Sequence, residues 1–274
     1  MASLPLPCMH IFDSSGSPVV CIEVLGDYSH ELISGMEVTC YGDFIGYCMG
    51  RCERSDLNRM KDELAVALAE ARVTDPGTRI ETGTHLRPFV DYERRMLDRE
   101  PPRPVGVLYD GFELCAAYNM LLSHAGNPVG GLVLVITNKL FGTFDETDSR
   151  YHARVIILGH PCIISTTGLV EAPARPREYY IEKQLGLGEL HREADIPEKW
   201  LRPDDPRTTE VLKGYLAQAI FHYVTGEPFC EEGGCRLFNA HWQEDLLFSQ
   251  LDGESEFCLH HEQILGTFTG ATDE

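Results

Sequence analysis

Residues 105–137 decide the fold class, and they read VGVLYDGFELCAAYNMLLSHAGNPVGGLVLVIT. The runs 105–109 and 132–137 are short and rich in Val, Leu and Ile, which is typical of buried strands, and residues 111–123 predict a helix that ends before Gly126. Parallel neighbours need a long crossover, which is usually a helix. We therefore expect strands 105–109 and 132–137 to pair side by side in parallel, joined by the helix at 111–123.

The alternation of strands and helices extends through the first two thirds of the chain. Ser55 is the expected N-cap of a helix in which Leu57, Met60 and Leu64 recur at helical spacing. The pattern predicts a single α/β domain over residues 1–274, with a mixed sheet packed against helices. Further strands are predicted at residues 18–24, 37–47, 153–158 and 162–166, and beyond Ala174 helices are predicted at residues 176–185, 208–224, 239–251 and 257–265.

The net charge and the number of cysteines limit which binding partners and which cellular compartment we expect for this protein. The chain carries 23 Lys and Arg against 43 Asp and Glu, a formal net charge of −20, which argues against binding nucleic acid or an anionic membrane through a basic face. No run is apolar and long enough for a signal peptide or a transmembrane helix. Ten cysteines without an export signal indicate a reducing compartment, so we expect a cytoplasmic protein.

A metal-ligand pattern stands near the C-terminus. Cys230 and Cys235 form C-x4-C, and Cys258 with His261 forms C-x2-H. Three thiolates and one imidazole complete a tetrahedral zinc shell, and a shell filled by protein ligands is structural rather than catalytic. The second pair is spaced to share one face of a helix. The sequence therefore predicts one structural zinc ion held by these four residues, with His260 or His241 as alternatives for the fourth ligand.

Other candidate ligands are less well supported by their spacing. Cys40, Cys48 and Cys52 could supply three thiolates, but no fourth ligand of matching spacing lies nearby, and we interpret them as small buried hydrophobic residues. His241 and Glu244 stand one turn apart and resemble half of an inverted H-x-x-E-H metal motif. We interpret this pair as part of a solvated helix face.

Residues 213–261 resemble the C-terminal half of the archaemetzincins, zinc metallopeptidases of the metzincin clan with the signature H-E-x-x-H-x-x-G-x-x-H-C-x4-C-M followed by C-x-x-C. Residues 230–235 match C-x4-C, and residues 258–261 match C-x-x-C with the last Cys replaced by His261. The whole chain more closely resembles an uncharacterised archaeal family described as metallopeptidases, through Leu140–Asp145 and residues 151–180 and 239–244. The resemblance implies a metzincin-like mixed sheet and a helical C-terminal segment, residues 208–265, stapled by the structural zinc.

The catalytic motif departs from this signature. Residues 218–222 read QAIFH where H-E-x-x-H is expected, so only the second histidine, His222, is present and Ala219 replaces the glutamate. Gly226 then falls one residue late, and the third histidine position lies near Pro228. A peptidase of this class needs three histidines on an open zinc and a glutamate as general base. The departure favours a catalytically inactive relative that binds a peptide or protein partner in the former cleft.

Two other functions stay open at this point. The chain could be an active zinc-dependent metallopeptidase with a non-standard catalytic set, in which His222 is the one candidate catalytic residue. It could also be a purely structural zinc protein. Metal stoichiometry separates these hypotheses, because a catalytic zinc adds a second ion to the structural one.

Overall fold

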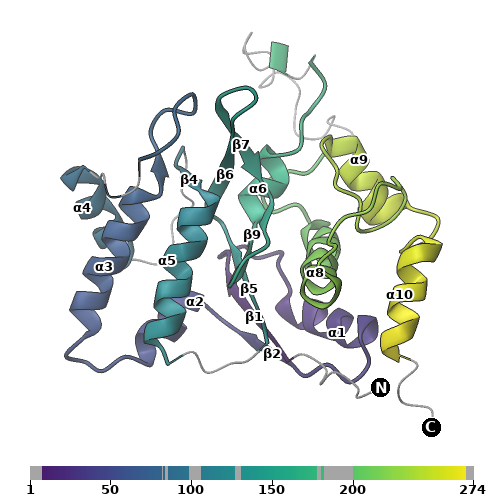
Figure 1. Cartoon of the computed structure of the whole chain (residues 1–274), viewed down its shortest axis with the longest axis horizontal. Coiled ribbons are helices and arrows are strands. Elements are labelled where there is room, and N and C mark those ends of the chain that lie inside the picture. The colour runs from purple at the N-terminus through teal and green to yellow at the C-terminus, as the bar shows by residue number, and fades with distance from the viewer. Residues whose placement is uncertain are drawn as a thin grey trace.

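The computed structural model describes residues 8–81, 83, 86–98, 106–126, 131–177, 180–181 and 200–269. Two β-sheets and the helices that cover them make up this part of the chain, which confirms the α/β class (Figure 1). The first sheet has the strand order β2-β1-β5-β9-β8 and the second the order β3-β4-β6-β7. Both sheets are mixed, because each combines parallel and antiparallel pairs.

The five-stranded sheet is parallel over four of its strands. These are β1 (Met9–Ser14), β2 (Val38–Tyr41), β5 (Leu132–Thr137) and β9 (Cys162–Ser165), and β8 (Ile156–Ile157) closes the sheet antiparallel to β9. All six residues of β5 are buried. A strand that is apolar on both faces is stable only between two layers of helices, so β5 lies at the centre of the sheet.

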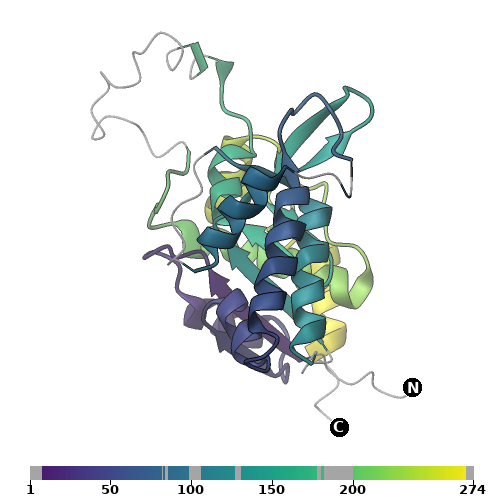
Figure 2. The same ribbon diagram turned by 90° about the vertical axis from the view of Figure 1, so that its left-hand side faces the viewer.

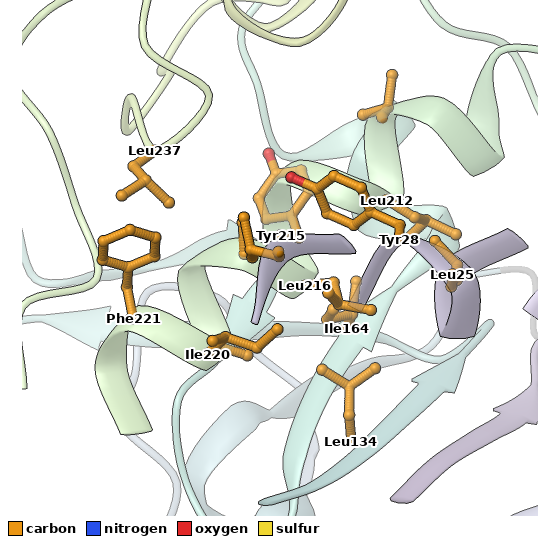
Figure 3. Close-up of a cluster of buried hydrophobic side chains, with 14 of the residues drawn as sticks. Leu25, Tyr28, Leu134, Ile164, Leu212, Tyr215, Leu216, Ile220, Phe221 and Leu237 are labelled. Carbon is orange, nitrogen blue, oxygen red and sulfur yellow. The ribbon is translucent and has the colours of Figure 1, made fainter. Parts of the chain in front are cut away.

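Helices cover both faces of this sheet. On one face, α1 (Ile22–Leu32) and α8 (Thr208–Thr225) pack over Leu134 and Ile164 of the sheet (Figure 3). The other face is covered by α2 (Phe44–Gly50), α3 (Leu57–Glu70) and α5 (Gly111–His124) (Figure 2). These helices pack over strand residues that include Phe12 and Val135. No helix in the described ranges has both the length and the apolar character needed to cross a membrane.

The four-stranded sheet joins the first one at a two-residue link. It consists of β3 (Arg72–Val73), β4 (Leu108–Asp110), β6 (Leu140–Asp145) and β7 (Arg150–Arg154), and only Asn138 and Lys139 separate β5 from β6. Helix α4 (Arg87–Met96) packs on α3 beside this sheet. The side chain of Asp110 accepts hydrogen bonds from the backbone N–H groups of Phe112 and Glu113, which caps α5.

The C-terminal part is helical, as expected. Helix α6 (Thr166–Glu171) follows β9, and α8 crosses the sheet and ends at Gly226, whose φ of 80° is a left-handed conformation that favours glycine. Helix α9 (Gln243–Leu247), the π-helical turn η2 (Phe248–Asp252) and α10 (Leu259–Thr269) complete the chain on the same side as α8 (Figure 1).

The predicted pairing of residues 105–109 with 132–137 is wrong. Strand β4 pairs in parallel with β6 in the four-stranded sheet, whereas β5 pairs with β1 and β9 in the five-stranded sheet. Helix α5 therefore links two sheets instead of two neighbouring strands. The physical reason is burial: β5 is apolar on both faces and needs parallel neighbours, whereas β4 is three residues long and ends in the capping Asp110.

Several element boundaries also differ from the predictions. Residues 18–24 form no strand; α1 begins at Ile22, because buried Leu25, Tyr28 and Leu32 recur at helical spacing and outweigh the local strand propensity. The strand predicted at 37–47 ends at Tyr41, since the side chain of Asp43 caps α2. The N-cap of α3 is Asp56 rather than Ser55. The strand predicted at 153–158 is divided between β7 and β8, and the helix predicted at 239–251 begins only at Gln243. Most of the helix predicted at 176–185 lies outside the described residues.

Candidate metal centre

Four side chains from separate parts of the C-terminal region converge on one point. The ligand atoms of Cys230, Cys235, Cys258 and His261 all lie within 4.8 Å of one another. The Sγ atoms of Cys230 and Cys258 are 3.9 Å apart, and Nδ1 of His261 lies 3.0 Å from Sγ of Cys258 and 3.7 Å from Sγ of Cys235. Ligands about 2.0–2.3 Å from a tetrahedral zinc ion lie roughly 3.5–3.8 Å from each other. The group can therefore hold a metal ion.

Local backbone bonds position the first pair of thiols. The backbone N–H of Glu232 donates to Sγ of Cys230, 3.3 Å away, and the N–H of Cys235 donates to the carbonyl of Glu232. The N–H of Cys230 donates to the carbonyl of Leu237, so the chain returns beside its own start. These bonds fold residues 230–235 into a compact turn, called the knuckle below, which directs both sulfur atoms to the same side.

The second pair lies at the start of α10. The N–H of Glu262 donates to the carbonyl of Cys258, which closes the first helical turn and brings His261 over Cys258. The ring of His261 packs edge-on against Phe221 of α8, at 5.3 Å between ring centroids. These four potential metal ligands, the Cys3His group, therefore connect residues 230–235 and α10 at the C-terminal end of α8.

Burial controls the protonation of this group. Burial raises the pKa of Cys235 to about 12 and also raises the pKa of Cys230. Burial, followed by the neighbouring His260, lowers the pKa of His261, which keeps its imidazole neutral and able to donate a lone pair. Without a metal the two thiols hold their protons at neutral pH. A bound divalent cation stabilises the thiolates instead and releases those protons.

The alternative ligands lie elsewhere. His260 is exposed and packs edge-on against the ring of His261, and His241 is exposed and lines a different cleft. Among the described residues, only two groups of three or more side chains can hold a metal, and Cys40, Cys48 and Cys52 belong to neither. Cys48 is buried in the apolar core and Cys52 donates to its carbonyl, whereas Cys40 is exposed on β2.

The second group was not found by sequence reasoning. Asp145, Asp148 and His152 meet at the hairpin between β6 and β7, where Nε2 of His152 lies 2.8 Å from Oδ2 of Asp148. Hydrogen bonds from Thr147 lower the pKa of Asp145, and the bond with His152 lowers the pKa of Asp148. The spacing of these residues carries a signal only once the hairpin register is known, because Asp145 pairs with Arg150 across the turn.

A cleft of about 620 Å³ lies between the two sheets and α8. Its walls come from the edge strands β7 and β8, from Tyr215 of α8 and from Phe229 and His241 of the following loops. His152 of the second group also lines it. The cleft is thus bounded by strand edges, aromatic rings and two imidazoles.

Helix α8, on which the sequence predicts the remnant of a catalytic motif at residues 218–222, presents no set of metal ligands among the described residues. His222 is exposed in the last turn of α8, lines none of the described cavities that border this helix, and belongs to neither metal-ligating group of the described chain. Gln218 and Ala219 are buried, and the side-chain amide of Gln218 donates to the carbonyl of Phe238. This part of α8 is packed into the core.

Comparison with known proteins places the chain in a family. Neither the search of curated proteins nor the search of solved structures gives a match. A family model described as "Probable metallopeptidase family (DUF6775)" matches residues 51–268, which is well over half of the chain and includes the Cys3His group and the cleft. The chain therefore belongs to this probable metallopeptidase family.

Proposed function

We propose that this protein is a zinc-binding relative of the archaemetzincins that has lost the catalytic zinc motif and binds a peptide or a protein partner in the former active-site cleft. The observation that carries the proposal is the convergence of Cys230, Cys235, Cys258 and His261. The first and last of these residues are far apart in the sequence, and apolar packing alone gives three thiols and an imidazole no reason to meet.

The donor set favours zinc and a structural role. Thiolates select soft or borderline cations, and a tetrahedral site with three sulfur ligands and one nitrogen ligand suits zinc. The four side chains occupy all four coordination positions, which leaves none for a catalytic water. The ion would link the knuckle at residues 230–235 to α10 and hold both against Phe221 of α8.

The end of α8 supports the loss of a catalytic zinc. Gly226 ends α8 with a left-handed φ of 80°, and it stands four residues before Cys230, as the glycine does in H-x-x-G-x-x-H-C. Counting from these two anchors puts the glutamate position at Ile220 and the three histidine positions at Ala219, Tyr223 and Phe229. Counting from His222 instead still leaves two histidines and the glutamate absent. Phe229, at the third histidine position, lines the cleft, and this supports the assignment of the cleft as the former active site.

The cleft suits an extended polypeptide. Strands β7 and β8 are the last strands of their sheets, and an edge strand presents backbone N–H and C=O groups to which a further strand can be added. The N–H of Tyr151 already donates to the carbonyl of Pro76, so a further strand would pair with β7 beyond Tyr151. Tyr215 and Phe229 provide apolar surface for side chains, and Arg154 provides a cation for a carboxylate. None of the ten cysteines, all of which are described, forms a disulfide, and this supports our proposal that the protein works in the cytoplasm.

One observation favours an active peptidase as the second candidate. Asp145, Asp148 and His152 lie at the hairpin beside the cleft, and two carboxylates with an imidazole can hold a zinc ion that keeps a fourth position open for water. In this alternative, His152 connects the metal to the cleft.

Zinc content and hydrolysis separate the two candidates. We expect the purified protein to contain one zinc per chain and to leave casein and a peptide library uncleaved when zinc is added, because the general base and at least two of the three histidine ligands are absent from the motif. Two zincs per chain, with cleavage that a chelator abolishes and that His152→Ala also abolishes, would establish the active peptidase instead. A protein without zinc would contradict both.

A further inference from the structure

The connections of the five-stranded sheet reverse direction between β1 and β5. From β1 the chain passes through α1, on one face of the sheet, to β2, which neighbours β1 on one side. It later passes through α2, α3 and α5, on the opposite face of the sheet, to β5, which neighbours β1 on the other side. In open parallel sheets, such a reversal leaves a crevice at the carboxyl ends of the two strands, where ligands bind. Here the strands end at Ser14 and Thr137, which are register partners.

A cavity of about 90 Å³ lies at this point. Its walls include Ser14 at the end of β1 and Thr137, Asn138 and Lys139 at the end of β5, and α4 and the ring of Tyr109 close it. It shares no lining residue with the cleft of about 620 Å³. A cavity of about 150 Å³ holds a benzene ring, so this one accommodates a smaller ligand.

Among the described residues, Lys139 supplies the only positive charge on the wall of this cavity. Its Nζ lies 5.1 Å from the centroid of the Tyr109 ring. Lys61 and Lys213 form ion pairs with Asp98 and Glu210, but among the described residues no carboxylate lies within ion-pair distance of the Lys139 ammonium. Burial lowers the pKa of Lys139, because an ammonium held away from water without a direct counter-ion is destabilised. A carboxylate bound beside it would favour the ammonium form.

Two neutral donors accompany this ammonium. Asn138 is 8% exposed and lines both this cavity and a neighbouring one of about 490 Å³, and its Nδ2 has no hydrogen-bond partner in the described structure. The hydroxyl oxygen of Ser14 accepts the backbone N–H of Phe44, which leaves the hydroxyl proton able to donate. A buried amide that is not hydrogen-bonded is destabilising unless a ligand or water satisfies it.

Nearby acidic groups limit the charge of the ligand. Glu93 lines the cavity but is paired with Arg72 and with the hydroxyl of Tyr109. Asp43 is exposed and caps α2 through its bond with the N–H of Gly46. The cavity therefore suits a ligand with a single negative charge better than one with two, because its wall combines one ammonium and two neutral donors with two carboxylates.

We propose that this cavity is a binding site for a small monocarboxylate, with the carboxylate held by Lys139 and by the donors Asn138 and Ser14. The carboxylate belongs either to a simple organic acid or to a free amino acid, whose ammonium group Asp43 would attract. This site goes beyond the proposed peptide cleft and does not depend on it.

Nuclear magnetic resonance titration of the ¹⁵N-labelled full chain tests the site with acetate, glycine and inorganic phosphate, which are similar in size. We expect acetate and glycine to shift the amide resonances of residues 14, 138 and 139 in a saturable way, and phosphate to bind more weakly. Glycine binding more tightly than acetate, with the difference lost in Asp43→Asn, would identify the amino-acid source. Equal affinities would identify the simple acid.

Lys139→Met should weaken acetate binding about tenfold or more, since a hydrogen bond to a charged group is lost. Lys213→Met is the matched control, because Lys213 pairs with Glu210 on α8 and should leave the affinity unchanged. If Lys139→Met fails to fold, Asn138→Ala serves in its place: it removes an unpartnered amide and should weaken binding about fivefold. No saturable shift at these residues, phosphate binding at least as tightly as acetate, or unchanged affinity in the folded variants would overturn the proposal.

Discussion

Replacing Cys235 with Ser is expected to remove the bound zinc and to lower the free energy of unfolding by more than about 4 kcal/mol, because loss of a structural metal is among the few single changes with effects of that size. The thiol of Cys235 is buried and within 3.7 Å of Nδ1 of His261, so no other side chain can take its place without moving the knuckle. The loss should be confined to residues 230–238 and to α10, because α8 is held against the five-stranded sheet by its own buried face. The two sheets have their own apolar core around β5 and should stay folded.

Zinc content, thermal unfolding and amide hydrogen exchange check this result. Exchange should rise in α10 and in residues 230–238 while β1, β5 and β9 stay protected. Cys21→Ser is the matched control, because the Cys21 thiol bonds to Glu23 at the start of α1 and lies outside the metal-ligating group. A Cys235→Ser protein that keeps its zinc and its stability would show that this thiol is not a ligand.

Replacing Arg72 with Met is expected to lower the free energy of unfolding by about 3–5 kcal/mol. Glu93 is only 1% exposed, and Arg72 donates to its Oε1 at 3.1 Å while the hydroxyl of Tyr109 donates to the same atom at 3.0 Å. Without the guanidinium, a buried carboxylate keeps a single neutral donor. This ion pair joins α4 to β3 and β4, so the four-stranded sheet should be affected most.

Chemical denaturation of three variants checks the effect of Arg72. The double variant Arg72→Met/Glu93→Met should be less destabilised than Arg72→Met alone, because no buried charge remains. Arg79→Met is the surface control: Arg79 and Glu146 form an ion pair with side chains 70% and 75% exposed, and such pairs contribute at most about 1 kcal/mol. If the Arg72→Met protein is no less stable than the Arg79→Met protein, the buried ion pair of Arg72 and Glu93 does not contribute the expected share of the free energy of unfolding.

The features that the sequence predicts correctly are local ones. Strand β5 and helices α5 and α8 follow from runs of neighbouring residues, and their observed bounds differ from the predictions by no more than one residue. The convergence of Cys230, Cys235, Cys258 and His261 could also be predicted, because each of the two pairs is defined within one tight turn or one helical turn. Cys258 and His261, for example, share the first turn of α10 whatever the rest of the chain does.

Features that depend on long-range pairing were not predictable. Nothing in residues 108–110 indicates that β4 joins β6 rather than β5, since the choice depends on how well each strand is buried by segments distant in sequence. The group at Asp145 and His152 requires the register of the hairpin between β6 and β7. Likewise, Lys139 reads as an ordinary loop residue until the topology places it at the carboxyl ends of β1 and β5.

X-ray absorption at the zinc edge tests the central claim most directly, because it reports the atoms bound to the metal. We expect one zinc per chain in a tetrahedral shell of three sulfur atoms at about 2.3 Å and one nitrogen atom at about 2.0–2.1 Å. That shell corresponds to Cys230, Cys235, Cys258 and His261. A shell made only of nitrogen and oxygen, or one with fewer than three sulfur atoms, would contradict the account.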